Sequence, residues 1–495
     1  MNLQRNLFDK NLWIVGLAIG VFMAGLMNGA SSYLKRVGMI DRADYSLFIN
    51  TYCDDPARAV GLRAQRCLCM RDPTEAADGE PKLPQQTLLS RRYLYETVGA
   101  ERALKAAKDI LSAALIGASL WLVFRRQNRV TGLASAWPLW ILVLAITLGS
   151  VASAFLWGGK FAVVGLRSFT FVAVALLGTW LSGGMHWVAR SVAALLVVQL
   201  VLVASEYAFG IPLRFCPNTF RAAGSLVLPN TLGVFAVAAL AFYAAFSLNA
   251  RFLWWLVAAT VVLVLASGSG TGVAALGAWG IWLGIERYGA QWSRAKMIAT
   301  VFVLAAILLA ALPYLVQRPT IYDSVLGREA RVGSLVRLVE QATPQQLLFG
   351  QGVGFGTNSG MTLLKDAPEA LPVTSTGEKF SADSTVTIMF TQLGVIGVLL
   401  FYAVLIWAFV RKPKARGFFI VASVTSLAIN LPETYPVNFL LGLALATIGA
   451  GVASRVLTSE AGSGALVERQ RSEPERKTGR IQLDVVKIIE GTTVS

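Results

Sequence analysis

Arginines at the ends of long apolar runs are the residues of this sequence best suited to chemistry. Arg221 opens the segment Arg221-Ala-Ala-Gly224-Ser225, and Arg331 lies in a polar stretch between two apolar runs. Arginine is costly near a lipid bilayer, so an arginine at a helix mouth commonly has an anionic partner. Its planar donor fork suits a phosphate or diphosphate. Together the arginines predict an anion site, although each alone could be solvated loop charge or a side chain that reaches lipid headgroups. The other basic residues assigned to this site are Lys160, Arg167, Arg214 and Arg328.

A carboxylate is expected at the same mouth as these arginines. Asp383 and Ser384 directly precede the apolar run near residues 386–410. Asp383 could act there as a general base or orient an acceptor group. The alternative is that Asp383 caps the N-terminus of the following helix. Glu206 and Glu433 are reserve acid–base candidates near the same boundary.

A glycine-rich run, Leu347-Leu-Phe-Gly350-Gln-Gly352-Val-Gly354-Phe-Gly356, follows Arg331 in the same polar stretch. It is superficially similar to a nucleotide-binding loop, but the Lys-Ser/Thr of a P-loop is missing and no strand is expected before it. A tight, backbone-rich turn near a polar ligand is the better interpretation, with Gly352 and Gly354 as binding candidates. The single histidine, His186, is assigned a structural role, and neither a metal nor a cofactor is expected.

The composition predicts a membrane scaffold for these residues. Of the 495 residues, 55% are hydrophobic and 15% are charged, whereas a soluble chain carries roughly a quarter charged residues. The net charge of +16 is ordinary for a membrane protein with basic cytoplasmic loops, so nucleic acid is not expected as a partner. We therefore predict an all-α polytopic membrane protein with membrane lipid as a partner.

Runs long enough to cross the bilayer predict about 12 transmembrane helices. A glycine-rich break at 268–272 separates two of them and is the weakest point of this count. The spans read as continuous, and their charges cluster at the mouths rather than at mid-membrane. The predicted runs lie near residues 12–30, 108–124, 136–157, 161–183, 188–208, 226–248, 252–268, 271–286, 297–316, 386–410, 417–432 and 436–453.

Lys and Arg in the short loops predict the orientation of the chain. One set of loops, which includes Arg125, Arg190, Arg251 and Arg411, is far richer in these residues than the other set. Both termini are therefore expected in the cytoplasm. The other face is periplasmic if the membrane is the inner membrane of a Gram-negative bacterium.

This topology divides the chain into six segments. They are the cytoplasmic N-terminus with the first helix (1–30), a periplasmic loop with cysteines (31–107), a transmembrane core of helices two to nine (108–316), a large periplasmic loop carrying site residues (317–385), helices ten to twelve (386–453) and a disordered cytoplasmic tail (454–495).

The four cysteines, Cys53, Cys67, Cys69 and Cys216, all fall on the predicted periplasmic side. An oxidising compartment permits disulfides. We expect one bridge from Cys53 to Cys67 or Cys69, and the remaining thiol could reach Cys216.

In motif order and topology, residues 140–450 resemble the O-antigen ligase and Wzy-type polysaccharide polymerase superfamily. The segment Arg221-Ala-Ala-Gly224-Ser225, followed by Pro229-Asn230, is similar to the family's Arg-x-x-Gly-Ser/Thr and Pro-Asn pattern. Arg331, Pro344 and the glycine-rich run are similar to its Arg, Pro and Gly-x-Gly-x-Gly loop. Asp383-Ser384 stands where ligases of the family carry His-Asn, which favours a polymerase. Ser269-Gly270 stands where Ser-Arg often follows the seventh helix, so one expected arginine is lost.

The resemblance implies a metal-independent glycosyltransferase that polymerises undecaprenyl-diphosphate-linked oligosaccharide into O-antigen or exopolysaccharide. Arg221 and Arg331 would stabilise the leaving diphosphate, Asp383 would orient or deprotonate the acceptor, and Asn230 and Ser384 would join the binding residues. A chain-length regulator and a flippase are expected as protein partners. One alternative is ligase-type transfer of finished glycan to lipid A core or another acceptor. A second alternative is a transporter of lipid-linked glycan.

Overall fold

The computed structural model describes the helical core of the chain together with short connecting segments. It covers residues 16–23, 107, 109–118, 121, 136–177, 184–208, 213–215, 219–226, 228–247, 250–288, 336, 339–340, 342–357, 360, 382 and 384–448. Asp383, Arg328, Arg331, the four cysteines, the proposed disulfide and the tail from residue 454 lie outside these residues.

Most described residues are helical. The elements are α8 (Trp137–Trp157), α9 (Gly159–Leu166), η3 (Arg167–Phe169), α10 (Thr170–Leu177), α11 (Met185–Ala208), β1 (Leu213–Phe215), β2 (Thr219–Arg221), α12 (Pro229–Phe246), α13 (Ala250–Ser267), α14 (Gly270–Tyr288), α17 (Pro344–Phe349), α19 (Thr385–Arg411), η7 (Pro413–Ala415) and α20 (Arg416–Ala428). Further helical segments are 16–23, Asp109–Ala118 and Val437–Ile448. The predicted run near 297–316 lies outside the described residues.

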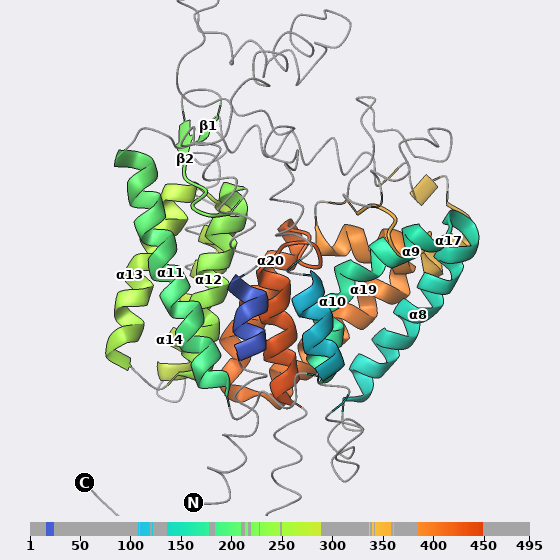
Figure 1. Ribbon diagram of the computed structural model, residues 1–495, viewed down its shortest axis with the longest axis horizontal. Helices are drawn as coiled ribbons and strands as arrows, with labels where there is room; N and C mark the ends of the chain where they lie inside the picture. The colour runs from blue at the N-terminus through green and yellow to red at the C-terminus, as the bar shows by residue number, and fades with distance from the viewer. Residues whose placement is uncertain are drawn as a thin grey trace, which may run out of the picture. The chain divides into compact units, whose positions relative to one another are not determined.

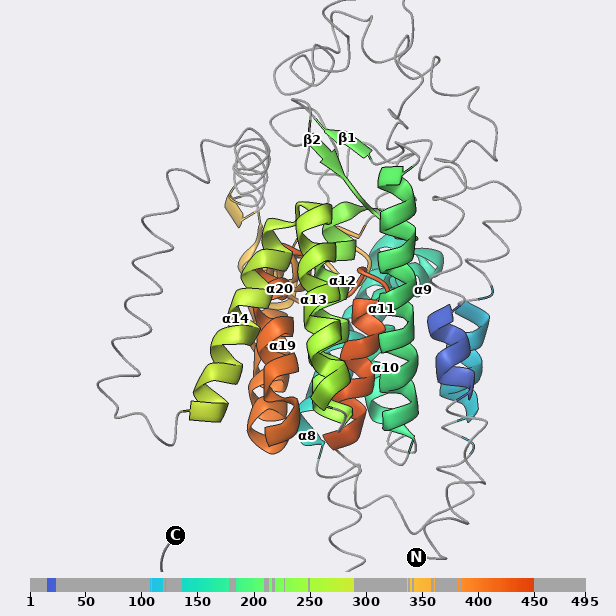
Figure 2. The ribbon, with the colours of Figure 1, turned by 90° about the vertical axis from the view of Figure 1, so that its left-hand side faces the viewer.

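The helices stand side by side, and β1 and β2 lie together beyond one end of them (Figures 1 and 2). We call this end the hairpin end and the other the opposite end. Helices α8 and α11 run toward the hairpin end, while α12 and α19 begin there and run away from it. The site candidates of β2, the start of α12 and the start of α19 therefore share one end of the structure.

Helix α12 is enclosed by neighbouring helices. It contacts α11, α13, α14 and α20, and Phe235 and Phe242 on it are fully buried. A helix that is apolar all round is expected to be enclosed by others. Its alanines and Gly233 allow close approach, because a Cβ on Gly233 would collide with Ser269 at the start of α14. Small residues at such contacts are typical of helices packed within a membrane.

Five helices are long and apolar enough to cross a membrane, judged by length and composition over the described residues: Trp137–Trp157, Gly159–Leu176, Met185–Ala208, Pro229–Phe246 and Thr385–Arg411. Their environments differ. Within the structure, 72% of the most apolar window of Pro229–Phe246 is buried, but only 28% of that of Trp137–Trp157. Phe155 on α8 is 87% exposed. An apolar helix with so much uncovered apolar surface is what a lipid-facing span requires.

The glycine break predicted at 268–272 separates two helices, as expected. Helix α13 ends at Ser267 and α14 begins at Gly270. Gly268 between them has φ +55°, a left-handed conformation that glycine adopts at little cost.

From Gly350 to Gly356 the glycine-rich run is a tight turn, as predicted, and it contacts α8, α9 and α19, whereas residues 347–349 belong to the end of α17. Its glycines 350, 352, 354 and 356 all have positive φ. From α8, Ser153 Oγ donates a hydrogen bond to Val353 O (2.7 Å) and Trp157 Nε1 donates one to Gln351 O (3.0 Å). On the α9 side, a Cβ on Gly165 would collide with the Gly354 backbone. We call residues 348–356 the glycine clasp.

Helix α19 is not continuous, so the expectation of unbroken spans is wrong for this one. Gly394 has φ 68° and ψ −162° within it, which interrupts the helix. The break admits the glycine clasp: Gln351 N donates to Thr391 O (2.8 Å) and Gly352 N donates to Gln392 O (3.2 Å). Where the helical hydrogen bonds of α19 are interrupted, the glycine clasp therefore supplies backbone donors to its carbonyl oxygens.

We expect Gly394→Ala to lower the free energy of unfolding by at least about 2 kcal/mol, because a left-handed φ disfavours a Cβ and overpacking adds to the cost. The new Cβ would collide with the backbone of Leu348. Thermal unfolding of the detergent-solubilised protein measures the loss.

The matched control is Gly280→Ala in α14, where a Cβ meets nothing within 4 Å. It should leave stability unchanged or raise it by up to about 1 kcal/mol through helix propensity. Equal effects of the two substitutions would contradict the role given to the close contact at Gly394.

Candidate functional site

Arg221 is held where three elements meet at the hairpin end. It is the last residue of β2, which pairs antiparallel with β1, opposite Leu213. Its Nε donates a hydrogen bond to Ser267 O at the end of α13 (2.7 Å), and its Nη2 donates one to Asn230 Oδ1 at the start of α12 (2.6 Å). The predicted site residues Arg221 and Asn230 are therefore in direct contact.

These two contacts orient the guanidinium of Arg221. Ser267 O and Asn230 Oδ1 are neutral acceptors. Partial burial lowers the pKa of Arg221 from its ordinary value, but an arginine remains protonated in proteins. A part-buried cation in a fixed orientation can bind a phosphate group through charge-assisted hydrogen bonds.

The segment after Arg221 turns its backbone N–H groups into the protein. The amides of Ala222, Ala223 and Ser225 are each bonded. Their acceptors are, in that order, Ala266 O (2.9 Å), Glu206 Oε2 (3.0 Å) and Gln199 Oε1 (2.9 Å). These amides are engaged, so they do not form a backbone nest for an anion. The capacity to bind an anion in this segment therefore resides in the Arg221 side chain.

Glu206 and Gln199 on α11 bring two buried polar side chains to the site. Both are essentially inaccessible to solvent. Glu206 was a reserve acid–base candidate, but its burial behind the Arg221 segment makes it a partner of the backbone there. Gln199 was not singled out from the sequence, although a glutamine within an apolar span is a recognisable signal.

Ser384 and the glycine clasp form a second group at the hairpin end. Ser384 Oγ accepts a hydrogen bond from Thr387 N (3.1 Å) and caps α19. Ser384 is thus the N-cap residue of α19, and Asp383, for which the sequence suggested a cap, lies outside the described residues. Ala382 N donates to Gly356 O (2.9 Å), which attaches the start of α19 to the clasp. Gly352 and Gly354 are buried against Ser153 and Phe161.

Glu433 lies beside this second group. Asn430 Nδ2 donates to Glu433 Oε2 (2.9 Å) and lies 3.3 Å from Ala382 O. Glu433 N donates in return to Asn430 Oδ1 (3.3 Å). The Glu433 carboxylate is part-buried and is attached through Asn430 to the backbone residue that precedes Asp383. Its place makes it a second acid–base candidate at this mouth.

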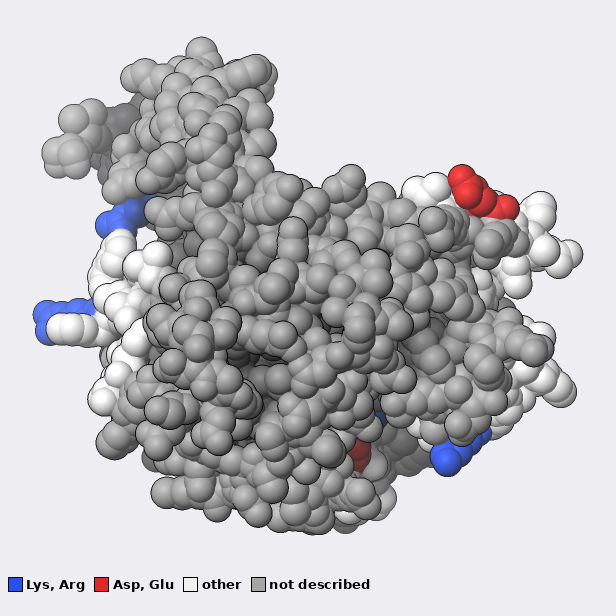
Figure 3. All heavy atoms as spheres, turned by 90° about the horizontal axis from the view of Figure 1, so that it is seen from above, with Lys and Arg blue, Asp and Glu red and all other residues white. Residues whose placement is uncertain are grey.

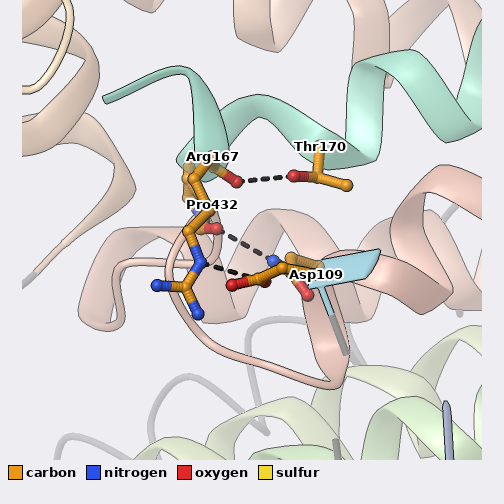
Figure 4. A network of polar contacts seen from close by, with 5 residues as sticks. Asp109, Arg167, Thr170 and Pro432 are labelled. Carbon is orange, nitrogen blue, oxygen red and sulfur yellow. Dashed lines mark hydrogen bonds and ion pairs between the residues drawn. The ribbon is translucent and has the colours of Figure 1, made fainter. Parts of the chain in front are cut away.

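Arg167 is paired with a carboxylate. Its Nε lies 3.1 Å from Asp109 Oδ1, and the two side chains are 43% and 42% exposed. Figure 4 shows the pair beside the Pro432 backbone, with Thr170 bonded to the carbonyl oxygen of Arg167. Arg167 therefore has an anionic partner within the protein itself, which its sequence context did not indicate.

Two further basic candidates, Lys160 and Arg214, lie on α9 and β1. Lys160 is exposed on α9, and Arg214 lies on β1 with its side chain outside the described part of the structure. In Figure 1, α9 and β2 lie on different sides of the helical core. Viewed from the hairpin end, the charged side chains that are described form a few separate groups near the rim (Figure 3). The hydrogen bonds of the described residues place Arg221 in one group of polar contacts and Ser384 in another.

We expect Asp109→Asn to change the free energy of unfolding by less than about 1 kcal/mol, since an exposed ion pair contributes little. Chemical unfolding of the detergent-solubilised protein measures this. A loss of roughly 3 kcal/mol or more, typical of breaking a buried pair, would contradict the exposure of this pair.

The site therefore consists of an oriented arginine at β2 and a capped helix start at α19, both at the hairpin end. No protein-family model matches the chain, and no curated protein matches it.

Proposed function

We propose that this protein is a membrane glycosyltransferase that polymerises undecaprenyl-diphosphate-linked oligosaccharide repeat units at the periplasmic face of the bacterial inner membrane. The observation that carries the proposal is Arg221, a part-buried cation oriented by Ser267 O and Asn230 Oδ1. It stands at the mouth of apolar helices, where the diphosphate of a lipid anchored in the bilayer would lie.

The distribution of charge supports the orientation in this proposal. Arg190, Arg251, Arg287, Arg411 and Arg416 all lie near helix termini at the opposite end. Clusters of arginine mark the cytoplasmic side of membrane proteins. The opposite end is then cytoplasmic, the hairpin end is periplasmic, and 12 spans with both termini in the cytoplasm complete the topology.

The proposed reaction needs little from the protein beyond charge and orientation. An acceptor sugar hydroxyl attacks the anomeric carbon of the donor, a new glycosidic bond forms, and the bond from that carbon to the diphosphate oxygen breaks. The electron pair leaves with undecaprenyl diphosphate, and the hydroxyl proton passes to a carboxylate, Asp383 or Glu433. Negative charge grows on the leaving group, so a prepositioned Arg221 would stabilise the transition state more than the ground state. Arg331 is proposed as its partner.

We expect Arg221→Ala and Arg331→Ala each to lower the rate of polymer formation about 100-fold or more, the scale seen when one preorganised donor is removed. The matched control is Arg190→Ala at the opposite end, where the guanidinium lies 5.1 Å from the Trp187 ring centroid. It should leave the rate near that of the wild type. The measurement is incorporation of labelled repeat units by purified protein in liposomes. Full-length polymer at normal abundance from both test variants would overturn the proposal.

Cells that lack the protein should accumulate single repeat units on undecaprenyl diphosphate, because polymerisation is the step removed. Gel electrophoresis of the lipid-linked glycans shows this directly. A ligase on the same scaffold would instead leave long lipid-linked chains that are not transferred. That result would show that the protein is a ligase and not a polymerase.

A lipid-linked glycan transporter is the second candidate, and the break in α19 is the observation that favours it. Transporters place broken helices at their substrate sites. Gln392, two residues before Gly394, is fully buried and its side-chain amide has no hydrogen-bond partner among the described residues. Flux of lipid-linked glycan into proteoliposomes without polymer formation would establish transport in place of polymerisation.

A further inference from the structure

Gln199 and Glu206 lie along one face of α11, beneath the segment that carries Arg221. They are seven residues apart, which is about 10 Å along a helix. Glu206 Oε2 accepts from Ala223 N (3.0 Å), and Gln199 Oε1 accepts from Ser225 N (2.9 Å). The chain from Arg221 to Ser225 therefore descends along α11, away from the hairpin end.

This descent places irregular backbone deep among apolar helices. Gln199 lies nine residues before the end of α11, about 13 Å below it. Residues 222–226 are all buried. Under the proposed function, this depth lies within the outer half of the bilayer, where non-helical backbone is tolerated only if protein encloses it and bonds its polar groups.

Glu206 and Gln199 supply the acceptors that these buried backbone N–H groups require. Buried side chains with a full or partial negative charge are expensive in a membrane span and mark functional positions. Gln199 engages Ser225 twice, because its Nε2 also donates to Ser225 Oγ. A Cβ on Gly224, which has φ +57°, would collide with the Gln199 side chain. Side chains of α11 thus bond the segment at Ala223 and Ser225, both within four residues of Arg221.

We infer that Gln199 and Glu206 are positioning residues, which hold the backbone of the Arg221 segment and so determine where the guanidinium meets a lipid-linked diphosphate. The inference rests on the proposed function. Neither side chain touches substrate, since both are fully buried. They act through Ala223 and Ser225, while Ser267 and Asn230 orient the tip of the arginine.

The test is equilibrium binding of radiolabelled undecaprenyl diphosphate to the full-length protein in detergent micelles. We expect Gln199→Leu and Glu206→Leu each to weaken binding about tenfold or more, because each leaves a buried amide without its acceptor. Glu206→Gln should restore most of the affinity, since its amide oxygen can still accept from Ala223. In an Arg221→Ala background, Gln199→Leu should cause no further loss, because the two residues act through one group.

The matched control is Thr260→Val. Thr260 is also fully buried, on α13, and its hydroxyl has no hydrogen-bond partner among the described residues. This variant should bind as the wild type does. If the leucine variants do not fold, the milder Ser225→Ala decides: it removes only the acceptor of Gln199 Nε2 and should weaken binding about threefold.

The outcomes separate this inference from the proposed function. Folded Gln199→Leu and Glu206→Leu proteins, or Ser225→Ala where it must decide, that bind like the wild type while Arg221→Ala binds weakly would overturn the inference alone. Additive losses in the Gln199→Leu, Arg221→Ala double variant would also overturn it. Wild-type binding by Arg221→Ala would remove the diphosphate site itself, and the proposed function with it.

Discussion

The structure depends on one constraint: a backbone amide among apolar helices must find an acceptor within the protein. Where the chain is helical, the helix meets the constraint by itself. At the segment after Arg221 it cannot, so Ala266 O, Glu206 and Gln199 supply the acceptors. An irregular segment can therefore lie among apolar helices without losing its hydrogen bonds.

The same constraint explains the glycine clasp. The break at Gly394 interrupts the helical ladder of α19, and the amides of Gln351 and Gly352 are bonded to the carbonyl oxygens of Thr391 and Gln392. These bonds bring two backbones closer than a Cβ would allow, and Gly350 and Gly394, whose φ values are also positive, lie at this contact. Hydrogen bonds thus join the clasp to α8 and α19, and the start of α19 is attached to the clasp through Ala382 and Gly356.

Charge is arranged differently in the two halves of the hairpin end. Arg221 is part-buried and donates hydrogen bonds to Ser267 O and Asn230 Oδ1. Arg167 meets the carboxylate of Asp109 where both are well exposed to solvent. A screened pair of this kind contributes little to stability. In the proposed reaction Arg221 carries the charge stabilisation.

For the described residues, the sequence by itself determined the approximate positions of the long apolar helices, the break after Ser267 and the tight turn of the glycine-rich run. These features depend on local properties: apolar length and the conformational freedom of glycine. It also indicated Arg221 and Asn230, because their motif lies between two apolar runs.

Only the tertiary structure decided that α19 is broken, that Ser384 caps it, that Arg167 pairs with Asp109, and that Gln199 and Glu206 bond the backbone of the Arg221 segment. The contact of Arg167 with Asp109, and those of Gln199 and Glu206 with the Arg221 segment, join residues that are far apart in the chain. Such contacts depend on which helix faces pack together, and hydrophobic periodicity alone carries no record of that choice in helices that are apolar on every side.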